Sequence, residues 1–226
     1  MPSLKKLETS LTLTEQAHRS IKRYILAKNP GGDMRMTETF FAEQLGISKS
    51  PVREALNTLQ SEGLLRIEPR RGAFVYQFSP KEIADLYDLR NALESFAAET
   101  VDITTELVDE LRSSVVRTET LLSTNDKEAY IDEDIHFHQL IVKSTGNDEL
   151  LRVHSNLQEK LWLCRLQTYQ MSSSDTPSAH KAIAEALAAG DRKAAQERTH
   201  DHIKFVRGML VKASEERVAA EAAPTV

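Results

Sequence analysis

The sequence predicts a mainly α-helical protein in two parts, residues 1–78 and residues 79–226, with one short β-hairpin in the first part. Apolar residues recur at helical spacing over most of the chain, whereas strand-like alternation is confined to residues 65–76. The charge divides in the same way. Residues 1–78 hold 12 basic and 8 acidic residues, whereas residues 79–226 hold 17 and 26. A basic first part joined to an acidic second part is typical of a nucleic-acid-binding module fused to a domain with another task.

Composition excludes several classes of protein. Of the 226 residues, 40% are hydrophobic and 28% are charged, which suits one large or two modest globular domains. No apolar run approaches the roughly 20 residues of a membrane span, and the first ten residues lack the apolar stretch of a secretory signal. Cys164 is the only cysteine, so no intrachain disulfide can form. We therefore expect a cytoplasmic protein that has no membrane partner.

In the first part, capping residues and glycines delimit three helices. Thr12 and Glu15 form a possible capping box for the first helix, which the Asn29–Asp33 segment ends. Thr37 can cap a short second helix that ends at Gly46, and a third helix runs from Ser48 to Gly63. We expect two strands after it, at Leu65–Glu68 and Ala73–Tyr76, with Pro69–Gly72 as the hairpin tip.

The segment Ala42–Leu56 has the features of a helix-turn-helix. Gly46 permits a left-handed turn between the second and third helices. Small polar side chains keep the start of the third helix slim enough for a major groove, and its amides, with Ser48, Lys49 and Ser50, can hold phosphates. Arg53 lies one turn further on, where a guanidinium can reach the O6 and N7 atoms of a guanine. The plainer alternative is a helical hairpin with solvated charges.

The hairpin tip adds a second basic feature. Arg70 and Arg71 stand beside Gly72, where the backbone can approach the neighbouring minor groove of DNA. Together with Glu62–Leu65, the tip and the helix-turn-helix resemble the winged helix of the GntR superfamily of regulators over about residues 14–76. The resemblance implies that the first part binds double-stranded operator DNA.

Two positions depart from that family's usual pattern. The family often has arginine where this chain has Lys49, and often has arginine after the glutamate equivalent to Glu38, where this chain has Thr39. Lysine is a point charge that cannot form the two-pronged contact of a guanidinium. We therefore expect the preferred operator to differ from the family's usual sequence.

The second part is predicted to be an all-helical bundle. Ser79, Pro80 and Glu82 form a strong helix-start signal, and no strand-like alternation follows it. We expect the tail after about Ala213 to fray. The expected helices cover about residues 80–101, 105–123, 126–144, 148–171, 177–189 and 191–213.

Four side chains in the second part form a candidate metal site. Asp134 and His138 are four residues apart and share one helical face, while His180 and His202 lie in later helices. Three imidazoles and one carboxylate suit a divalent transition metal such as Zn²⁺, Ni²⁺ or Mn²⁺ rather than Ca²⁺. Spacing alone leaves the alternative that these are ordinary surface or core histidines.

Several motifs of the second part resemble the FCD domain of the FadR-type branch, over about residues 79–213. They are Asp85–Glu94, Asp134–His138, Ser144–Asn147, His180–Ile183 with Gly190–Asp191, and His200–Ile203. The resemblance implies that Asp134, His138, His180 and His202 hold one metal ion per chain inside the bundle. It also implies that Arg90 and Asn147 lie near the effector cavity.

Other residues of the second part have plainer interpretations. Arg90 can face a metal-bound carboxylate or pair with Glu94 on the next helical turn, and the sequence leaves both open. His136 and His200 fall on other helical faces, and His154, like His18 in the first part, has no expected role. Cys164 lies in an apolar helix and is expected in the core.

Three functions remain in view. The first is a transcription regulator that acts as a homodimer and responds to a small organic acid bound at the metal. The second is a metalloenzyme with an appended DNA-binding domain, and the third is a regulator with a purely structural metal. We expect no enzyme, because the sequence has neither a His-Glu-x-x-His motif nor a Ser or Cys nucleophile with a placed base.

Overall fold

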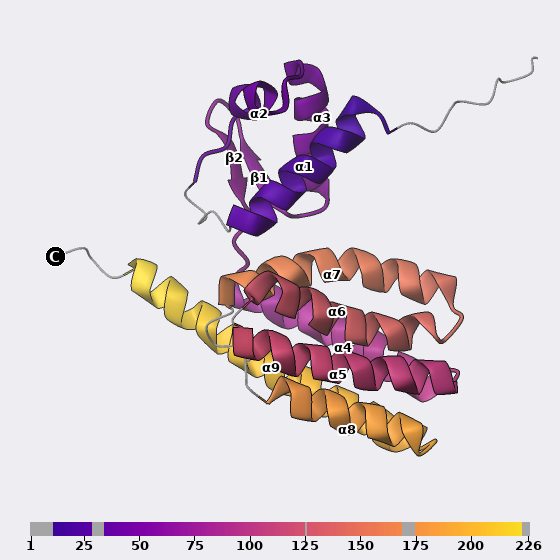
Figure 1. The fold of residues 1–226 in the computed structure, drawn as a ribbon. Coiled ribbons are helices and arrows are strands. Elements are labelled where there is room, and N and C mark those ends of the chain that lie inside the picture. The colour runs from indigo at the N-terminus through magenta and orange to yellow at the C-terminus, as the bar shows by residue number, and fades with distance from the viewer. Residues whose placement is uncertain (1–10, 29–33, 125, 169–174, 223–226) are drawn as a thin grey trace, which may run out of the picture. The chain divides into compact units, whose positions relative to one another are not determined.

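The computed structural model describes residues 11–28, 34–124, 126–168 and 175–222 (Figure 1). The chain divides into two compact units, Met1–Tyr76 and Gln77–Val226, whereas the sequence placed the division between residues 78 and 79. The Asn29–Asp33 segment, which was expected to end the first helix, lies outside the described residues, as do the last residues of the helix expected over 148–171.

The first unit has the winged helix-turn-helix fold that the sequence predicts. Its elements are α1 (Leu13–Lys28), α2 (Glu38–Leu45), α3 (Lys49–Ser61), β1 (Leu65–Glu68) and β2 (Gly72–Val75). The hydroxyl of Thr37 caps α2 by accepting a hydrogen bond from the amide of Phe40 at 3.1 Å. Gly46 ends α2 in the left-handed conformation, with φ of 66°. The two strands pair antiparallel, with Leu65 opposite Val75 and Glu68 opposite Gly72.

Apolar stripes of α1 and α3 form the core of this unit. Ile21 and Ile25 of α1 and Val52, Leu56 and Leu59 of α3 are all buried, as their helical spacing predicts.

A third backbone segment lies beside the hairpin, and no pattern in the sequence predicts it. Met36 and Ala73 exchange two backbone hydrogen bonds of 2.8 Å, so the chain before α2 lies beside β2. Gly72 is required there, because its φ is 110° and a Cβ atom would lie 2.7 Å from the carbonyl oxygen of Met36.

The second unit is all-helical in the part that the structure describes, as predicted. Its helices are α4 (Pro80–Thr100), α5 (Thr105–Thr124), α6 (Lys127–Lys143), α7 (Asp148–Thr168), α8 (Thr176–Ala188) and α9 (Arg192–Ala222). The predicted capping box at the start of α4 is present: Ser79 and Glu82 each accept from the other's backbone amide. The expectation that the chain frays after Ala213 was wrong, because α9 continues to Ala222. Buried Ser214 and the guanidinium of Arg217 both donate to the carbonyl of Phe78, which ties this last stretch to the start of the unit.

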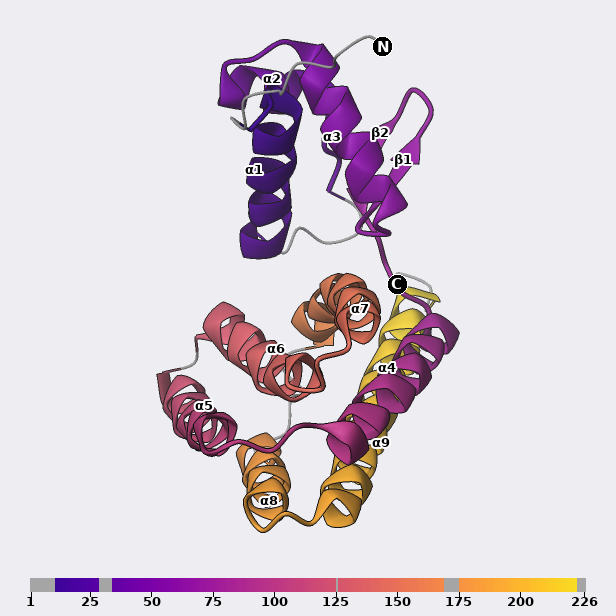
Figure 2. The same cartoon turned by 90° about the vertical axis from the view of Figure 1, so that its right-hand side faces the viewer.

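Figure 2 shows how the six helices pack. Helices α4 and α9 lie side by side. They are antiparallel, as two contacts show: Asp88 pairs with Arg207, and Glu99, further along α4, contacts Gln196, earlier in α9. Helix α8 packs on α9 and α5, α5 on α6, and α6 on α7. The core between them includes Ala97, Leu111, Phe137, Ile183 and Leu187. None of the helices in the described part of the chain is long and apolar enough to cross a membrane.

Candidate metal centre and nucleic-acid interface

The structure brings the four predicted metal ligands together in the interior of the second unit. Asp134 and His138 come from successive turns of α6, His180 from the first turns of α8 and His202 from α9. All four are buried, and one ligand atom from each lies within 4.8 Å of the others. The Nε2 atoms of His138 and His180 are 3.1 Å apart, and Oδ1 of Asp134 lies 3.4 Å from Nε2 of His180.

Burial keeps the three imidazoles neutral. It lowers the pKa of His138 to about 4, against the opposing pull of Glu94, and lowers the pKa of His180 and of His202 to about 3. Neutral imidazole is the form that coordinates metal, so these ligands do not have to lose a proton at pH 7.

Aromatic stacking fixes the imidazoles in place. Phe137 stacks on the ring of His180, with centroids 4.0 Å apart and planes 3° from parallel. The rings of His138 and His202 stack with centroids 5.3 Å apart. Packed rings hold their side-chain rotamers, so the ligand atoms are positioned before any ion arrives.

A buried arginine that the sequence analysis missed pairs with the one acidic ligand. Nη1 of Arg165 in α7 lies 2.5 Å from Oδ2 of Asp134, and its Nε donates to the hydroxyl of Tyr87 at 3.3 Å. Burial alone would raise the pKa of Asp134, but Arg165 holds that pKa well below its usual range. Oδ2 is thus engaged by Arg165, whereas Oδ1 faces the histidines.

Arg90 pairs with Glu94 on the next helical turn, which is one of the two arrangements that the sequence leaves open. It is fully buried, and its Nε donates to Oε1 of Glu94 at 2.9 Å. Its Nη1 and Nη2 have no hydrogen-bond partner among the described residues. Its charge nevertheless acts on the pKa of all four candidate ligands, so Arg90 belongs to the electrostatic environment of the site.

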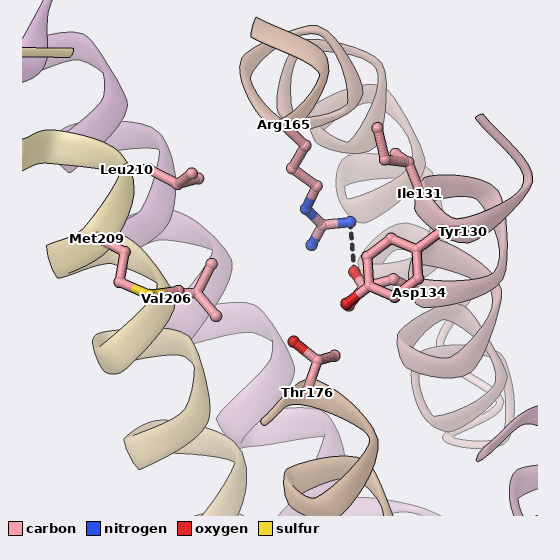
Figure 3. Close-up of a pocket in the computed structure, with 8 residues that line it drawn as sticks. All are labelled: Tyr130, Ile131, Asp134, Arg165, Thr176, Val206, Met209 and Leu210. Carbon is pink, nitrogen blue, oxygen red and sulfur yellow. Dashed lines mark ion pairs between the residues drawn. The ribbon is translucent and has the colours of Figure 1, made fainter. Parts of the chain in front are cut away.

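A cavity of about 30 Å³ lies beside Asp134, large enough for about one water molecule. Figure 3 shows Arg165 and Asp134 facing each other across it, with Thr176 at the start of α8 nearby. Its walls come from α6, α7, α8 and α9. They are formed by Tyr130, Ile131, Asp134, Arg165, Thr176, Val206, Met209 and Leu210.

The donor set fits a divalent transition metal. Nε2 of His202 is buried and has no hydrogen-bond partner in the described part of the chain, which is costly unless a ligand satisfies it. One ligand atom from each of the four residues lies within 4.8 Å of the others, so a single ion between them could contact all four after their side chains shift inward.

Other residues singled out from the sequence lie away from this cluster. Asn147 is exposed and accepts a hydrogen bond from the amide of Leu150 at the start of α7, whereas Arg165 is near the other end of that helix. His136 contacts Glu110, and His200 contacts Asn91. Asn147 is thus not part of the lining of the cavity beside Asp134.

In the first unit, the predicted DNA-contacting residues at α2 and α3 are exposed. Thr39 lies on α2, and Ser48, Lys49 and Ser50 stand at the start of α3. Arg53 makes a two-pronged ion pair with Glu38 of α2, with nitrogen–oxygen distances of 2.8 and 2.9 Å. The sequence does not predict this pair. To contact a base, the guanidinium of Arg53 would have to break at least one of its two hydrogen bonds to Glu38.

The two arginines at the hairpin tip differ. Arg71 pairs with Glu68 and lies over the ring of Phe74, whereas Arg70 makes no hydrogen bond or ion pair with the described residues. Arg70 has a φ of 65°, a conformation that non-glycine residues rarely adopt. The guanidinium of Arg70 therefore lies at the exposed turn without a partner among the described residues. Gly72 has a different task, because its missing side chain lets the backbone of Met36 approach closely.

A winged helix-turn-helix joined to a helical bundle with a buried polar centre defines a DNA-binding transcription regulator. Residues 13–75 match the model of the bacterial regulatory proteins of the gntR family, and residues 85–205 match that of the FCD domain. The chain therefore belongs to the GntR family and carries a C-terminal FCD domain.

Curated relatives are transcription regulators, not enzymes. The chain is 33% identical to the gluconate operon transcriptional repressor of Bacillus licheniformis over 54% of this chain and 51% of that protein. It is 28% identical to a probable D-xylose utilization operon transcriptional repressor of Paenarthrobacter nicotinovorans over 74% of each. It is 25% identical to the uncharacterized HTH-type regulator YdhC of Bacillus subtilis (strain 168) over 89% of this chain and 95% of that protein. The match to the gluconate repressor thus spans only about half of its length.

Solved structures share the fold. A GntR regulator described as putative, from Rhodococcus sp. RHA1, aligns with a TM-score of 0.79 at 20% identity, over 88% of this chain and 98% of that one. E. coli McbR/YncC aligns with a TM-score of 0.75 at 20% identity, over 90% and 99%. A metal-free FCD domain, TM0439, aligns with a TM-score of 0.52 at 21% identity, over 61% and 96%.

Proposed function

We propose that this regulator is a repressor whose operator affinity changes when a small carboxylate effector binds at a metal ion in the FCD domain. The observation that carries the proposal is the convergence of Asp134, His138, His180 and His202, all buried, around one point. They would hold one divalent transition metal per chain, Zn²⁺, Ni²⁺ or Mn²⁺. Such an ion, when bound, offers open coordination positions to a carboxylate oxygen.

Charge around the site favours an anionic effector. The positive charges of Arg90 and Arg165 balance the negative charges of Glu94 and Asp134, and the histidines are neutral. A divalent ion therefore adds two positive charges that no nearby buried carboxylate offsets. Because uncompensated charge in a buried site is costly, an anion is strongly favoured there, and a mono- or dicarboxylate supplies it.

We assign the steering of the effector carboxylate to Arg90, whose terminal nitrogens lack partners among the described residues, and add Arg165 at the cavity. Arg165 already pairs with one carboxylate, that of Asp134, so an incoming carboxylate would compete for it or share it. Asn147 is not assigned to the effector, because its side chain caps α7.

The size of the cavity links binding to motion. At about 30 Å³, it is too small for an organic acid, so its walls must move apart for the effector to enter. Four helices, α6 to α9, supply those walls, and a shift among them is the change that would reach the DNA-binding unit. By linkage, operator DNA must alter effector affinity by the same factor as the effector alters operator affinity.

Operator recognition is assigned to the exposed residues of the first unit. We propose that Ser48, Lys49 and Ser50, with Thr39 beside them, contact phosphates, and that Arg53 reads a guanine. Arg70, Arg71 and Gly72 form the tip that approaches the minor groove.

We further propose a homodimer. One recognition helix reads few base pairs, and a two-fold dimer on a palindromic operator doubles the site. The large apolar side chains of Leu89 and Phe96 on α4 and Phe205 on α9 are exposed, which supports burial of this face against a second copy. A monomer in sedimentation at micromolar concentration, with and without DNA, would contradict it.

The proposed function is tested in two steps. Operator DNA is first selected from random duplexes, and the purified protein is analysed for metal. Metal-loaded protein is then titrated with mono- and dicarboxylates, with and without operator. We expect about one metal per chain and an effector whose affinity changes with operator. If effector affinity is the same with and without operator, or if no acid stabilises the protein, the proposed coupling is wrong. The result then supports the alternative of a regulator with a purely structural metal.

A further inference from the structure

A buried carboxylate stands directly behind one of the proposed metal ligands. Glu94 of α4 is only 2% exposed, yet no part of the proposed metal and effector chemistry uses it directly. Its Oε1 atom accepts from Nε of Arg90 at 2.9 Å and from Nε2 of Gln158 at 3.2 Å, and Nε2 of His154 lies 2.9 Å from it. These contacts come from α4 and α7 and satisfy Oε1.

The other oxygen of this carboxylate faces the metal site. Oε2 of Glu94 lies 2.8 Å from Nδ1 of His138, an ion-pair distance at which the two atoms do not meet the geometry of a hydrogen bond. An ionised carboxylate only accepts hydrogen bonds, so it favours the proton of the neutral imidazole on Nδ1. Nε2 then carries the lone pair, and Nε2 is the atom that lies 3.1 Å from Nε2 of His180 inside the ligand cluster.

Glu94 stays ionised although it is buried. Burial alone would raise its pKa, but Arg90 and then His138 hold the pKa well below its usual range. Arg90 therefore has a second contact besides its charge near the cavity, because its Nε donates to the carboxylate that stands behind His138.

We infer that Glu94 is a positioning residue of the metal centre, which fixes the Nδ1–H tautomer and the ring orientation of His138 so that Nε2 faces the ion. This inference rests on the proposed metal site. Its chemistry is that of a carboxylate–histidine–metal triad, in which the carboxylate acts through the ligand and not on the ion. His154 and Gln158 contact only Oε1 of Glu94, not the oxygen that faces His138, and are one step further from the metal.

The test compares Glu94→Gln with Gln158→Met. Glu94→Gln keeps the shape of the side chain but replaces an obligate acceptor by an amide, whereas Gln158→Met removes one donor from Oε1 and leaves Oε2 facing His138. With Zn²⁺ as the probe, we expect Glu94→Gln to lose about 10- to 100-fold in affinity. We expect Gln158→Met to stay within about three-fold, since the contact at Oε2 remains.

A second readout separates positioning from a loss of structure. The ¹⁵N chemical shifts of the imidazoles in the metal-free protein report which nitrogen of His138 carries the proton, and a His138→Gln variant assigns the signal. We expect Nδ1–H in the wild type and in Gln158→Met, and a loss of that preference in Glu94→Gln.

The outcomes distinguish this inference from the proposed function. A wild-type protein that binds no Zn²⁺ refutes the metal site and the inference that rests on it. A wild type that binds Zn²⁺ but carries the His138 proton on Nε2 in the metal-free form overturns the role of Glu94 alone, as does a folded Glu94→Gln protein with wild-type affinity. If the Glu94→Gln protein does not fold, the ¹⁵N measurement on the wild type still tests the inference, because it shows which nitrogen of His138 carries the proton.

Discussion

The two units of the molecule use charged side chains in opposite ways. In the DNA-binding unit, the side chains of Arg53 and Arg71 are 63% and 71% exposed, and each pairs with a carboxylate that is partly exposed. In the FCD unit, those of Arg90 and Arg165 are 0% and 8% exposed and pair with carboxylates that are buried as well. Exposed pairs are weak and screened by salt, so those arginines can exchange a carboxylate for DNA.

This difference predicts two kinds of response to mutation. An exposed arginine is expected to act alone, so its removal changes DNA binding but hardly changes stability. A buried charge belongs to a balanced group, so its removal leaves a partner charge without compensation, which costs several kcal/mol. The four predictions below test this contrast, from the largest expected effect to the smallest.

The largest effect is expected from removing two metal ligands. His138→Ala/His202→Ala takes away half of the proposed ligand set, and four-ligand metal sites bind with about 10–16 kcal/mol, so a loss on the order of 5 kcal/mol follows. Elemental analysis should find almost no metal in this variant. The matched control is His136→Ala/His200→Ala, which changes histidines of the same two helices outside the cluster and should keep about one ion per chain. Stoichiometric metal in the first variant would refute the site.

The second effect concerns the ion pair in the cavity. Arg165→Met leaves the carboxylate of Asp134 buried without its guanidinium, and we expect the metal-free protein to lose about 3–5 kcal/mol of unfolding free energy. Arg112→Met breaks a pair with Glu185 in the same unit, but both side chains are about half exposed, so we expect a loss below about 1 kcal/mol. Urea unfolding measures both. Equal losses would show that burial does not govern these pairs.

The same contrast explains what the sequence could predict. The residues of the DNA-binding unit lie within one local motif, and the local signals Thr37 and Gly46 correctly predicted the two ends of its α2. The Ser79 capping box did the same for the start of α4 in the second unit. The four metal ligands were found through the resemblance, since the spacing of Asp134 and His138 alone leaves other readings open.

The partners of those ligands were missed because they belong to contacts between helices. Arg165 reaches Asp134 from α7, and Glu94 reaches His138 from α4, and no spacing along the chain relates them. The sequence predicts no role for His154, yet this residue is buried and its Nε2 contacts Glu94. The end of α9 was missed for the same reason, because it depends on Ser214 and Arg217 binding the distant Phe78.

The third effect is a loss of specificity. Arg53→Ala should weaken binding to the selected operator by about 1–3 kcal/mol, the value of one two-pronged guanine contact. Binding to scrambled DNA should change much less, because the phosphate contacts proposed for Lys49 and the start of α3 would remain. Quantitative gel shifts on both duplexes measure this. The unfolding free energy should change by less than about 1 kcal/mol, since the pair with Glu38 is exposed. Equal losses on both DNAs would remove Arg53 from the role of base reader.

The smallest effect is expected at the hairpin tip, from the arginine that has no partner among the described residues. Arg70→Ala should weaken operator and scrambled DNA alike, because a charge near phosphates is read without regard to sequence. One lost phosphate contact lowers the slope of log K against log salt by about 0.9, which titrations at several salt concentrations can resolve.

Arg70→Gly separates this charge effect from the backbone. Glycine also removes the charge but adopts the φ of 65° without strain. The Arg70→Gly and Arg70→Ala proteins should therefore bind DNA equally well. The glycine protein should have the higher free energy of unfolding of the two. If the glycine variant kept wild-type affinity while the alanine variant lost it, the backbone of the tip and not its charge would be what DNA binding requires. A loss confined to the operator would instead make Arg70 a base reader and place sequence recognition in the wing as well as in α3.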